Sequence, residues 1–397
     1  MKIHVCLISD QTLQNLIPAL MERPNIVWLV VSAQMHKRGL DARLKGLLRQ
    51  MLDDPAVIVK ECLDVPDTGM PSIRKRALAL AEEIDATYKD AKVTLNATGG
   101  TKLMAIGFIE EFRSITDRII YTDTRNRRIE FLPAERQLRP EEVAIPDVLD
   151  VKLYLAAQGF LITQSASDDI EWRSRSNARK QAAKYLGKHA EQLGDFIGAL
   201  NGLADKALEK IPGSREEVLK GPLQNLTQTP WGVWADALRV LVEAKILSWQ
   251  EGSRDIAFYD VERTKFVRGV WLEEYAWHVI RDEKAYDVRH AVQIQPTHTQ
   301  ATENEIDVLA VHSNQLLVIE CKTLRFREGE NDNDLAYRID SLGRAARGLF
   351  GETWLLSARK PTPSLEERAR ENRFRIVGPA DLARFRDTVK IWMRGPA

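Results

Sequence analysis

From Lys2 to about Thr124 the chain alternates between short apolar runs and longer amphipathic segments. The runs are rich in Val, Ile and Leu, as strands are, and the segments between them have helical spacing. Strands and helices that alternate in this way form a parallel, Rossmann-like sheet. We predict strands at residues 3–8, 26–31, 57–62, 93–96 and 119–122, with helices that begin near residues 13, 38, 72 and 102.

Two polar loops follow strands of this predicted sheet. Ligands of such folds bind beyond the carboxyl ends of the strands, where backbone N–H groups and helix N-termini receive anions. The first loop, Ser9-Asp10-Gln11-Thr12, has residue types that also cap helices, so alone it is weak evidence of a site. The second, Asn96-Ala97-Thr98-Gly99-Gly100-Thr101-Lys102, is more specific, because its glycines allow close backbone approach and its hydroxyls and lysine suit phosphates.

The glycine loop is neither of the two common nucleotide-binding loops. Thr101 stands where a Walker A loop needs glycine before lysine, and the chain has no G-x-G-x-x-G. ATP hydrolysis and dinucleotide binding are therefore disfavoured. The alternative is that the glycines only permit a tight turn from strand to helix.

A second group of polar residues lies near the C-terminus. We predict strands at residues 306–311 and 316–319, the second buried on both faces, joined by a tight turn at Ser313-Asn314. Because side chains alternate along a strand, Glu320 and Lys322 share one face and Cys321 points to the other. The same pair of strands carries Asp307.

These residue types, two carboxylates and a lysine, are typical of the active site of a metal-dependent phosphodiesterase. Mg²⁺ and Mn²⁺ prefer oxygen ligands, which Asp307 and Glu320 supply, and Lys322 can orient water and offset charge. A bound metal lowers the pKa of water and polarises phosphorus, so no covalent intermediate is needed. The alternative is a surface strand whose Glu and Lys form weak ion pairs.

The segment from Gly269 to Tyr275 predicts the start of a helix that brings a further carboxylate to the sheet. Glu273 and Glu274 are the candidates in this segment, and Glu305 lies two residues before Asp307 in the sequence. The alternative is an ordinary amphipathic helix.

At 397 residues the chain is long enough for two or three domains. Its 57 basic and 57 acidic residues balance, so the net charge is no evidence for or against nucleic-acid binding. Local runs of cationic residues can still bind phosphates. One run lies at residues 173–188 and another at 125–128. A solvated helix face or hairpin is the simpler interpretation of each run.

The remaining composition excludes several classes of protein. Cys6, Cys62 and Cys321 are far apart and predicted to be reduced core residues. The seven histidines show no zinc-binding spacing. No apolar stretch approaches the ~20 residues of a membrane span, and no signal peptide is recognisable, so we expect a cytoplasmic protein without membrane association.

Residues 151–262 are predicted to be mostly helical, with breaks at Ile211-Pro212-Gly213-Ser214 and Gly221-Pro222. A helix over 231–244 and strands at 246–249 and 256–259 resemble a small winged-helix unit. Such a unit can bind DNA, but between two larger domains we favour a packing scaffold.

The loop at Asn96–Lys102 resembles that of a CARF domain, the CRISPR-associated Rossmann-fold sensor of cyclic oligoadenylates. Gly269–Glu273, Asp307 and Glu320–Lys322 resemble a PD-(D/E)XK restriction-endonuclease-like domain, with Ile306 in place of the proline of the motif. Their combination resembles the CARF-nuclease effectors of type III CRISPR systems. We therefore expect an α/β chain with a CARF domain at 1–145, a helical, winged-helix-like connector at 146–262 and a nuclease domain at 263–397.

The resemblance implies a homodimer whose two sensor domains bind one cyclic oligoadenylate, most plausibly cyclic tetra-adenylate, as an allosteric activator. It implies catalysis by Glu273, Asp307, Glu320 and Lys322 with Mg²⁺ or Mn²⁺ on Asp307 and Glu320. The substrate would be single-stranded RNA or DNA, or supercoiled DNA. The implied ligand contacts are Ser9, Asp10, Gln11, Thr98, Gly99, Gly100, Thr101 and Lys102.

Three other functions remain open at this point. The chain could be a ligand-controlled nucleic-acid-binding regulator with an inert nuclease fold, although the intact carboxylates and lysine argue against this. It could be a repair or restriction nuclease independent of cyclic oligoadenylate. A small-molecule α/β enzyme ranks last, because no nucleophile–histidine pair is evident.

Overall fold

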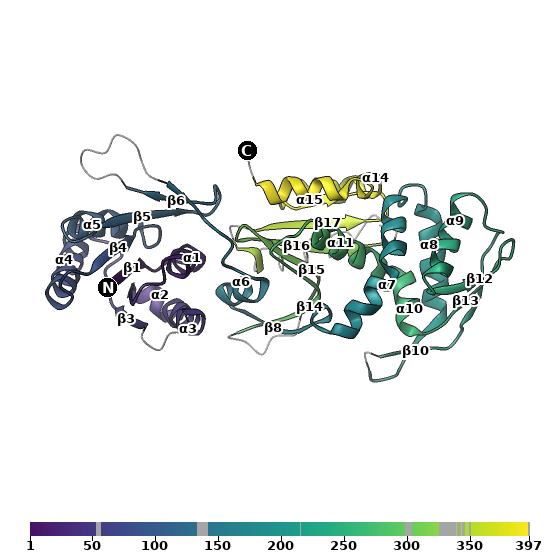
Figure 1. Ribbon diagram of the computed structural model, residues 1–397, viewed down its shortest axis with the longest axis horizontal. Helices are drawn as coiled ribbons and strands as arrows, with labels where there is room; N and C mark the ends of the chain where they lie inside the picture. Colours follow the sequence, from purple (N-terminus) through teal and green to yellow (C-terminus); the bar gives the residue numbers. More distant parts are fainter. Residues whose placement is uncertain are drawn as a thin grey trace.

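The computed structural model describes residues 1–52, 57–132, 142–214, 216–297, 304–324 and 351–395, and also residues 339, 343 and 346–348. The chain forms three parts in a row (Figure 1): an N-terminal α/β domain, a central sheet built mainly from C-terminal residues, and a helical part at the far end.

The N-terminal domain is a seven-stranded sheet with the order β3-β2-β1-β4-β5-β6-β7. Strands β1 to β5 are parallel to one another. Strand β6 pairs antiparallel with β5, and β7 pairs antiparallel with β6. The strands are β1 (Lys2–Leu7), β2 (Ile26–Val30), β3 (Ile58–Cys62), β4 (Lys92–Asn96), β5 (Arg118–Asp123), β6 (Arg128–Phe131) and β7 (Glu142–Ala144). This confirms the predicted Rossmann-like sheet.

Helices cover both faces of this sheet, because each face presents a separate apolar surface. One side has α1 (Leu13–Glu22), α2 (Ala33–Lys37) and α3 (Leu40–Leu52), and the other has α4 (Met70–Thr87) and α5 (Lys102–Phe112). The helix predicted to begin near residue 38 is α3, which begins at Leu40. The short helix α2 before it was not predicted, and Gly39, with a φ of 68°, lies between the two. Strands β6 and β7 were not predicted.

The central sheet has six strands in the order β18-β17-β16-β15-β14-β8. Strands β8, β14, β15 and β16 are antiparallel, whereas β16, β17 and β18 are parallel. They are β8 (Phe160–Ser165), β14 (Asp287–Pro296), β15 (Asn304–His312), β16 (Gln315–Lys322), β17 (Glu352–Ser357) and β18 (Arg375–Val377). The predicted turn is confirmed: Ser313 and Asn314 both have positive φ, as a two-residue hairpin of this hand requires.

Helices pack on this sheet and continue into the far helical part. They are α6 (Val151–Gln158), α7 (Ile170–Lys188), α8 (Gly194–Ala207), α9 (Val233–Glu243), α10 (Val261–Lys265), α11 (Trp271–Asp282), α13 (Pro363–Glu371), α14 (Pro379–Leu382) and α15 (Phe385–Arg394), with a 3-10 turn at Ala166–Asp168 and a π-helical turn at Phe266–Val270. Short strands β9 (Leu208–Lys210) and β10 (Glu217–Leu219) pair with each other. A second small sheet contains β11 (Leu223–Asn225), β12 (Leu247–Trp249) and β13 (Asp255–Phe258).

The helical part does not lie between the two larger domains, which corrects that expectation. Its helices α8 and α9 and the β12–β13 hairpin lie at the end of the molecule away from the N-terminal domain (Figure 1). The chain first adds β8 to the edge of the central sheet and only then enters α7. Its packing role is supported, since α7, α8 and α9 share one apolar core with the central sheet and α11.

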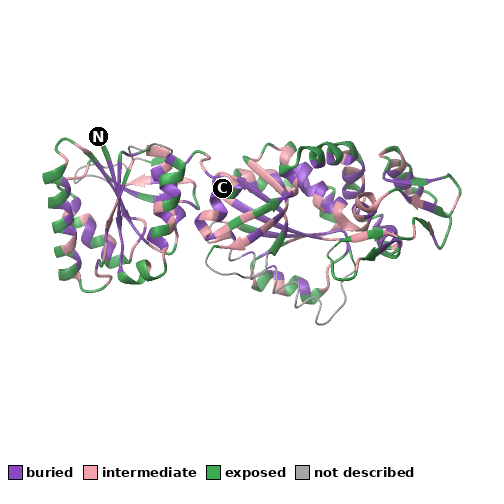
Figure 2. Cartoon of the chain, turned by 90° about the horizontal axis from the view of Figure 1, so that it is seen from below, coloured by how far each residue is buried: buried purple, intermediate pink, exposed green. Residues whose placement is uncertain are grey.

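The two larger domains pack directly on each other. One apolar core continues from α1 and α3 through α6 to the face of the central sheet that carries Leu309 and Val318. Figure 2 shows the strands of both sheets buried along most of their length. The two domains therefore share part of their hydrophobic core.

The predicted interpretation of the two basic runs holds for much of their length: Arg173, Arg175 and Lys188 are exposed on α7, and residues 125–128 lie at the β5–β6 hairpin. Other members of the runs make structural contacts. Arg179 is buried, and Lys180 and Lys184 pair with Asp282. Arg127 lies at the junction of the two larger domains, where its guanidinium reaches the carbonyl oxygens of Trp392 and Met393. The three cysteines are free and buried, as predicted. Within the described ranges, no helix is long and apolar enough to cross a membrane.

Candidate functional site

The predicted catalytic residues lie at one end of the β15–β16 hairpin. Val308 is opposite Ile319, and the same register continued by one residue places Asp307 opposite Glu320. Glu320 is two residues from Val318, so alternation along β16 places these two side chains on one face. Asp307 Oδ2 accepts a hydrogen bond of 2.7 Å from the Cys321 amide, which ties the two strands together beside the carboxylates. The pairing of the two strands thus brings two carboxylates and Lys322 to the end of the hairpin away from the turn.

The structure separates the roles of Glu273 and Glu274 in the first turn of α11. Glu274 is fully buried, and both its oxygens accept hydrogen bonds from the Arg179 guanidinium, at 3.0 and 2.9 Å from Nε. Glu273 instead lies close enough to Glu305 and Glu320 for their charges to raise its pKa. Glu273 is therefore the helix carboxylate that lies with the strand residues.

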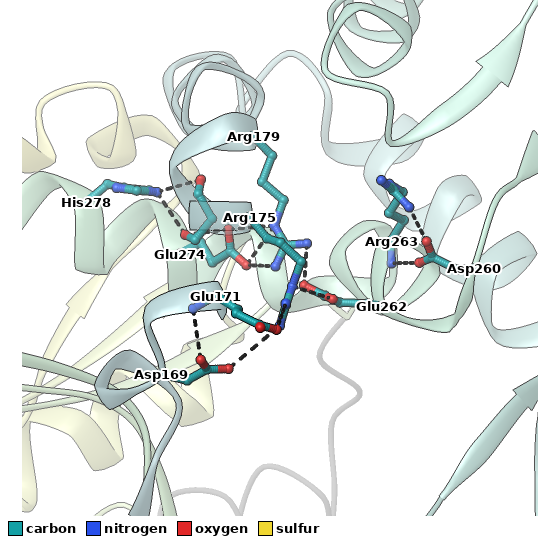
Figure 3. Close-up of polar contacts among 10 residues, drawn as sticks. Asp169, Glu171, Arg175, Arg179, Asp260, Glu262, Arg263, Glu274 and His278 are labelled. Atoms are coloured by element: carbon teal, nitrogen blue, oxygen red, sulfur yellow. Dashed lines mark hydrogen bonds and ion pairs between the residues drawn. The ribbon is translucent and has the colours of Figure 1, made fainter. Parts of the chain in front are cut away.

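A buried polar network holds α11 in this orientation (Figure 3). Arg179 of α7 also pairs with Glu262 of α10, with 2.9 Å between Nη1 and Oε1. Ser176 donates to Glu274 over 2.9 Å and lies 3.0 Å from His278 Nε2. Because Arg179 joins three helices, it sets the rotation of α11 and so the direction of Glu273.

Gly269 allows the chain to pass close to the sheet just before α11. A Cβ atom there would lie 2.8 Å from Thr323 Oγ1, directly after the Glu320–Lys322 segment. A side chain at this position would therefore push α11 away from β16.

The carboxylates share an environment that opposes their ionisation. Burial raises the pKa of Glu273 to about 8, and the charges of Glu305, Glu274 and Glu320 add to the effect. Burial also raises the pKa of Asp307 well above its usual range, with Glu273 and Glu320 contributing. Burial raises the pKa of the Cys321 thiol, which therefore stays protonated and is no nucleophile.

This environment predicts how the stability of the metal-free protein depends on pH. A carboxyl with a raised native pKa stabilises the fold at low pH, and that contribution is lost as pH rises through about 8. We expect the Tm in EDTA to fall from roughly pH 5 to pH 8 by several degrees more in the wild type than in Glu273→Gln. Differential scanning calorimetry across this range measures it. Equal slopes for the two proteins would assign the pH dependence to other groups.

The donor set fits a divalent cation of the Mg²⁺ type. Within the part of the chain that the structure describes, no three His, Cys, Asp or Glu side chains converge as a complete metal site. Mg²⁺ commonly takes only one or two protein carboxylates and completes its shell with water and substrate phosphates. Asp307 and Glu320 supply two such carboxylates, and a cation between them would offset the like-charge repulsion that raises the pKa of Asp307.

A cavity of about 500 Å³ opens beside these residues. Glu273 of α11 and Lys322 of β16 line it, together with Gly198 and Asn201 of α8. Asn201 Nδ2 donates to the carbonyl oxygen of Thr323 over 3.2 Å, which holds α8 against the end of β16. Of the four predicted catalytic residues, Glu273 and Lys322 line the cavity directly, and Glu320 is two residues from Lys322 along β16.

The two predicted ligand loops meet at the edge of the N-terminal sheet. Strands β1 and β4 are neighbours, and the strand order reverses between them, so the loops after these strands flank a topological switch point. Gly99 packs against the first loop: a Cβ there would lie 2.0 Å from the carbonyl oxygen of Leu7. Gly100 has a φ of 71°, which favours glycine.

Not every predicted ligand contact presents a free group. The Thr98 hydroxyl lies 2.5 Å from Asn96 Oδ1 and accepts from the Thr122 amide over 2.7 Å. Thr101 caps α5 by accepting from the Met104 amide. Both hydroxyls shape the loop, whereas Ser9 and Gln11 are half-buried and Asp10 and Lys102 are exposed at its rim.

Several residues of these sites were missed from the sequence. Arg38 forms an ion pair with Asp10 and brings a cation to the ligand loops. His290 lies with Nε2 3.4 Å from Glu273 Oε2, and burial lowers its pKa to about 4, so it is neutral at pH 7. Neither residue lies in a motif, so only their spatial neighbours identify them.

Comparisons with known proteins agree with this geometry. Residues 3–154 match the family model of the Card1 CARF domain, and residues 260–395 match that of the Card1-like endonuclease domain. The chain belongs to the Card1-like CARF endonucleases. Its N-terminal domain is a CARF domain and its central sheet belongs to an endonuclease domain. None of the curated proteins matched the sequence.

Solved structures show the same fold over almost the whole chain. Protein VC1899 from Vibrio cholerae is 22% identical with a TM-score of 0.80, covering 99% of this chain and 98% of its own. Can2 from Sulfobacillus thermosulfidooxidans, in complex with cyclic tetra-adenylate, is 23% identical with a TM-score of 0.72, covering 99% of both chains. A type III CRISPR defence DNA nuclease activated by cyclic oligoadenylate is 16% identical with a TM-score of 0.53, covering 91% of this chain and 46% of its own.

Proposed function

We propose that this CARF endonuclease is a metal-dependent phosphodiesterase activated by cyclic tetra-adenylate in type III CRISPR defence. The observation that supports it most is the gathering of Asp307, Glu320 and Lys322 at one end of a hairpin, beside a cavity that Glu273 also lines. The ligand named for Can2 and the defence role named for the DNA nuclease support the activator and the biological setting.

Asp307 and Glu320 would hold Mg²⁺ or Mn²⁺ through their carboxylate oxygens. When bound, such an ion polarises a phosphate and lowers the pKa of water. Lys322, two residues along the strand from Glu320 and on the same face, orients the attacking water and offsets the charge that develops on the phosphate. The substrate is a single strand of RNA or DNA, or supercoiled DNA.

The activator would bind between two CARF domains of a homodimer, against the loops at Ser9–Thr12 and Thr98–Lys102. Exposed Lys102 and Arg38 provide cations for its phosphates. Ligand binding must favour one arrangement of the nuclease domains over another for activation to follow.

A chain of contacts links the ligand loop to the catalytic hairpin. The Thr98 hydroxyl accepts a hydrogen bond from the amide of Thr122, near the end of β5. Five residues after Thr122, the Arg127 guanidinium donates to the side chains of Ser313 and Gln315 at the hairpin turn, over 3.1 and 3.3 Å. Asn314 in the same turn accepts from the amides of Val148 and Leu149. The turn at one end of β15–β16 is thus held by the CARF side, and the other end has the carboxylates.

Arg127→Ala is expected to uncouple activation from catalysis. We expect cyclic tetra-adenylate to bind with unchanged affinity but to stimulate cleavage about tenfold less, because each lost hydrogen bond to a charged group is worth roughly 1.5–3 kcal/mol. Isothermal titration and cleavage rates at saturating activator measure the two effects. Arg125→Ala, in the same loop, is the control. Full stimulation of Arg127→Ala would exclude this route of coupling.

The proposed function is tested by cleavage of labelled single-stranded RNA, single-stranded DNA and supercoiled plasmid with Mg²⁺ or Mn²⁺, with and without cyclic tetra-adenylate. We expect cutting that requires both metal and activator, and weaker activation in Lys102→Ala. Activator binding without cutting of any substrate would favour the regulator. Cleavage at the same rate with and without the activator would favour an ordinary repair or restriction nuclease.

A further inference from the structure

A second cavity, of about 910 Å³, lies beside the active-site edge and has no part in the chemistry described above. Arg359 and Lys360, which follow β17, and Phe374, which precedes β18, line it together with Asp195 of α8 and Trp234 of α9. Its volume lies within the range of ligand pockets, about 300–1,000 Å³. The cavity combines an aromatic wall with a buried cation.

Arg359 is the unusual member of this lining. Its side chain is only 10% exposed, yet its described partner is one carboxylate: Nη2 lies 3.2 Å from Oδ1 of Asp195, which is 78% exposed. Nη1 is buried and has no hydrogen-bond partner among the described residues. A guanidinium has five N–H donors, so Arg359 retains unused hydrogen-bonding capacity. An exposed ion pair is weak, and a phosphate can replace Asp195 at little cost.

The backbone of Arg359 is well fixed, so its position is not accidental. The Ser357 hydroxyl donates to the Arg359 carbonyl oxygen over 2.6 Å and accepts from its amide over 3.0 Å. Gly194 and Gly198 of α8 lie next to the guanidinium: a Cβ at Gly198 would make a tight contact of 3.3 Å with Nη1, and one at Gly194 an ordinary contact of 3.6 Å. The helix thus accommodates an arginine at this place.

Arg359 follows the strand next to the catalytic one. Ser357 of β17 pairs with Lys322 of β16, and the Ala358 amide donates to the Lys322 carbonyl oxygen over 2.9 Å. Strand spacing and rise place the Cα atoms of Lys322 and Arg359 about 8 Å apart. Helix α8 lines both cavities, with Asp195 at the second and Asn201 at the first. A single strand bound at Lys322 therefore meets Arg359 on the order of one or two nucleotides away.

We propose that this cavity is a nucleotide subsite for the substrate strand, in which Arg359 binds a phosphate next to the scissile one and Trp234 offers a face for a base. Trp234 is half-buried and stacks on Phe196 at 5.0 Å, which holds its ring in place. Stacking on aromatic rings together with cationic contacts to phosphates is how proteins bind single strands without reading sequence. The acidic side chains at the rim, including Asp195 and Glu366, are exposed and screened by salt, whereas buried Arg359 is not.

The subsite rests on the proposed nuclease function, so binding and cleavage are measured separately. In the Glu320→Ala background, fluorescence anisotropy with a labelled single-stranded oligonucleotide gives Kd at several salt concentrations. Adding Arg359→Gln is expected to raise Kd about tenfold and to reduce the slope of log Kd against log salt by about 0.7, the contribution of one phosphate contact on a single strand. In the active protein, Arg359→Gln should raise KM about tenfold with kcat nearly unchanged.

Lys188→Gln, which removes an exposed cation outside both cavities, is the matched control and should leave Kd and the salt slope unchanged. If Arg359→Gln fails to fold, Gln192→Glu adds a negative charge at the exposed rim and should raise Kd a few fold. Unchanged Kd and salt slope in the folded variants would overturn the subsite. If the wild type binds single strands in an Arg359-dependent manner but never cleaves, the nuclease proposal fails and the subsite stands.

Discussion

Replacing Glu320 by alanine is expected to lower the rate of nucleic-acid cleavage by at least about a thousandfold, because metal-held charge stabilisation is worth several kcal/mol. Glu320 is 2% exposed and lies opposite Asp307. Binding of cyclic tetra-adenylate should be unchanged, since the ligand loops lie in the other domain.

The measurement is the initial rate of cleavage at saturating activator, with activator affinity from titration calorimetry. Glu367→Ala, which removes an exposed carboxylate of α13, is the control and should keep full activity. Thermal unfolding checks the fold of both variants. Activity of Glu320→Ala within tenfold of the wild type would remove Glu320 from the catalytic site.

Replacing Arg179 by methionine is expected to lower the free energy of unfolding by about 3–5 kcal/mol. The change leaves the fully buried Glu274 carboxylate without its cation. It also removes the ion pairs by which Arg179 of α7 joins α10 and α11. Cleavage should also fall, because Glu273 then loses the orientation that α11 gives it. Urea denaturation followed by tryptophan fluorescence measures the effect, since Trp172 and Trp277 pack together beside this network.

Arg175 provides a control on the same helix. It pairs with Glu262 through Nε at 2.9 Å but is 45% exposed, so Arg175→Met should cost no more than about 1 kcal/mol. The double variant Arg179→Met/Glu274→Leu removes both buried charges and should recover most of the lost stability. A double variant as unstable as Arg179→Met alone would show that the stabilising effect of Arg179 does not depend on Glu274.

The main elements of the catalytic hairpin were predictable because their signals are local. Alternation along a strand places Glu320 and Lys322 on one face, and a Ser-Asn pair between two apolar runs indicates a tight turn. The glycine loop was recognisable for the same reason: Gly99 and Gly100 stand between an apolar run and a helical segment, directly before Thr101 and Lys102. None of these inferences needed a contact between distant residues.

Other features could not be read from the sequence. Strand β8 lies at a sheet edge with mostly exposed or half-exposed side chains, so it lacks the apolar run that marks a buried strand. The position of the helical part depends on that strand, because the chain pairs β8 with the edge of the central sheet before α7 begins. The basic run at residues 173–188 contains both Arg179, which is buried, and Arg175, which is not, although the residue type is the same.

The order of strands and helices, the two polar loops and the residue types of the proposed catalytic site follow from short-range patterns, since local spacing decides which side chains share a strand face or a turn. Only the folded chain decides that Glu273 faces the strands while Glu274 pairs with Arg179, and that Arg127 joins the two domains. It also decides that Ser357, two residues before Arg359, pairs with Lys322. Each of these relations joins residues far apart in sequence, and burial and charge at those contacts depend on tertiary packing.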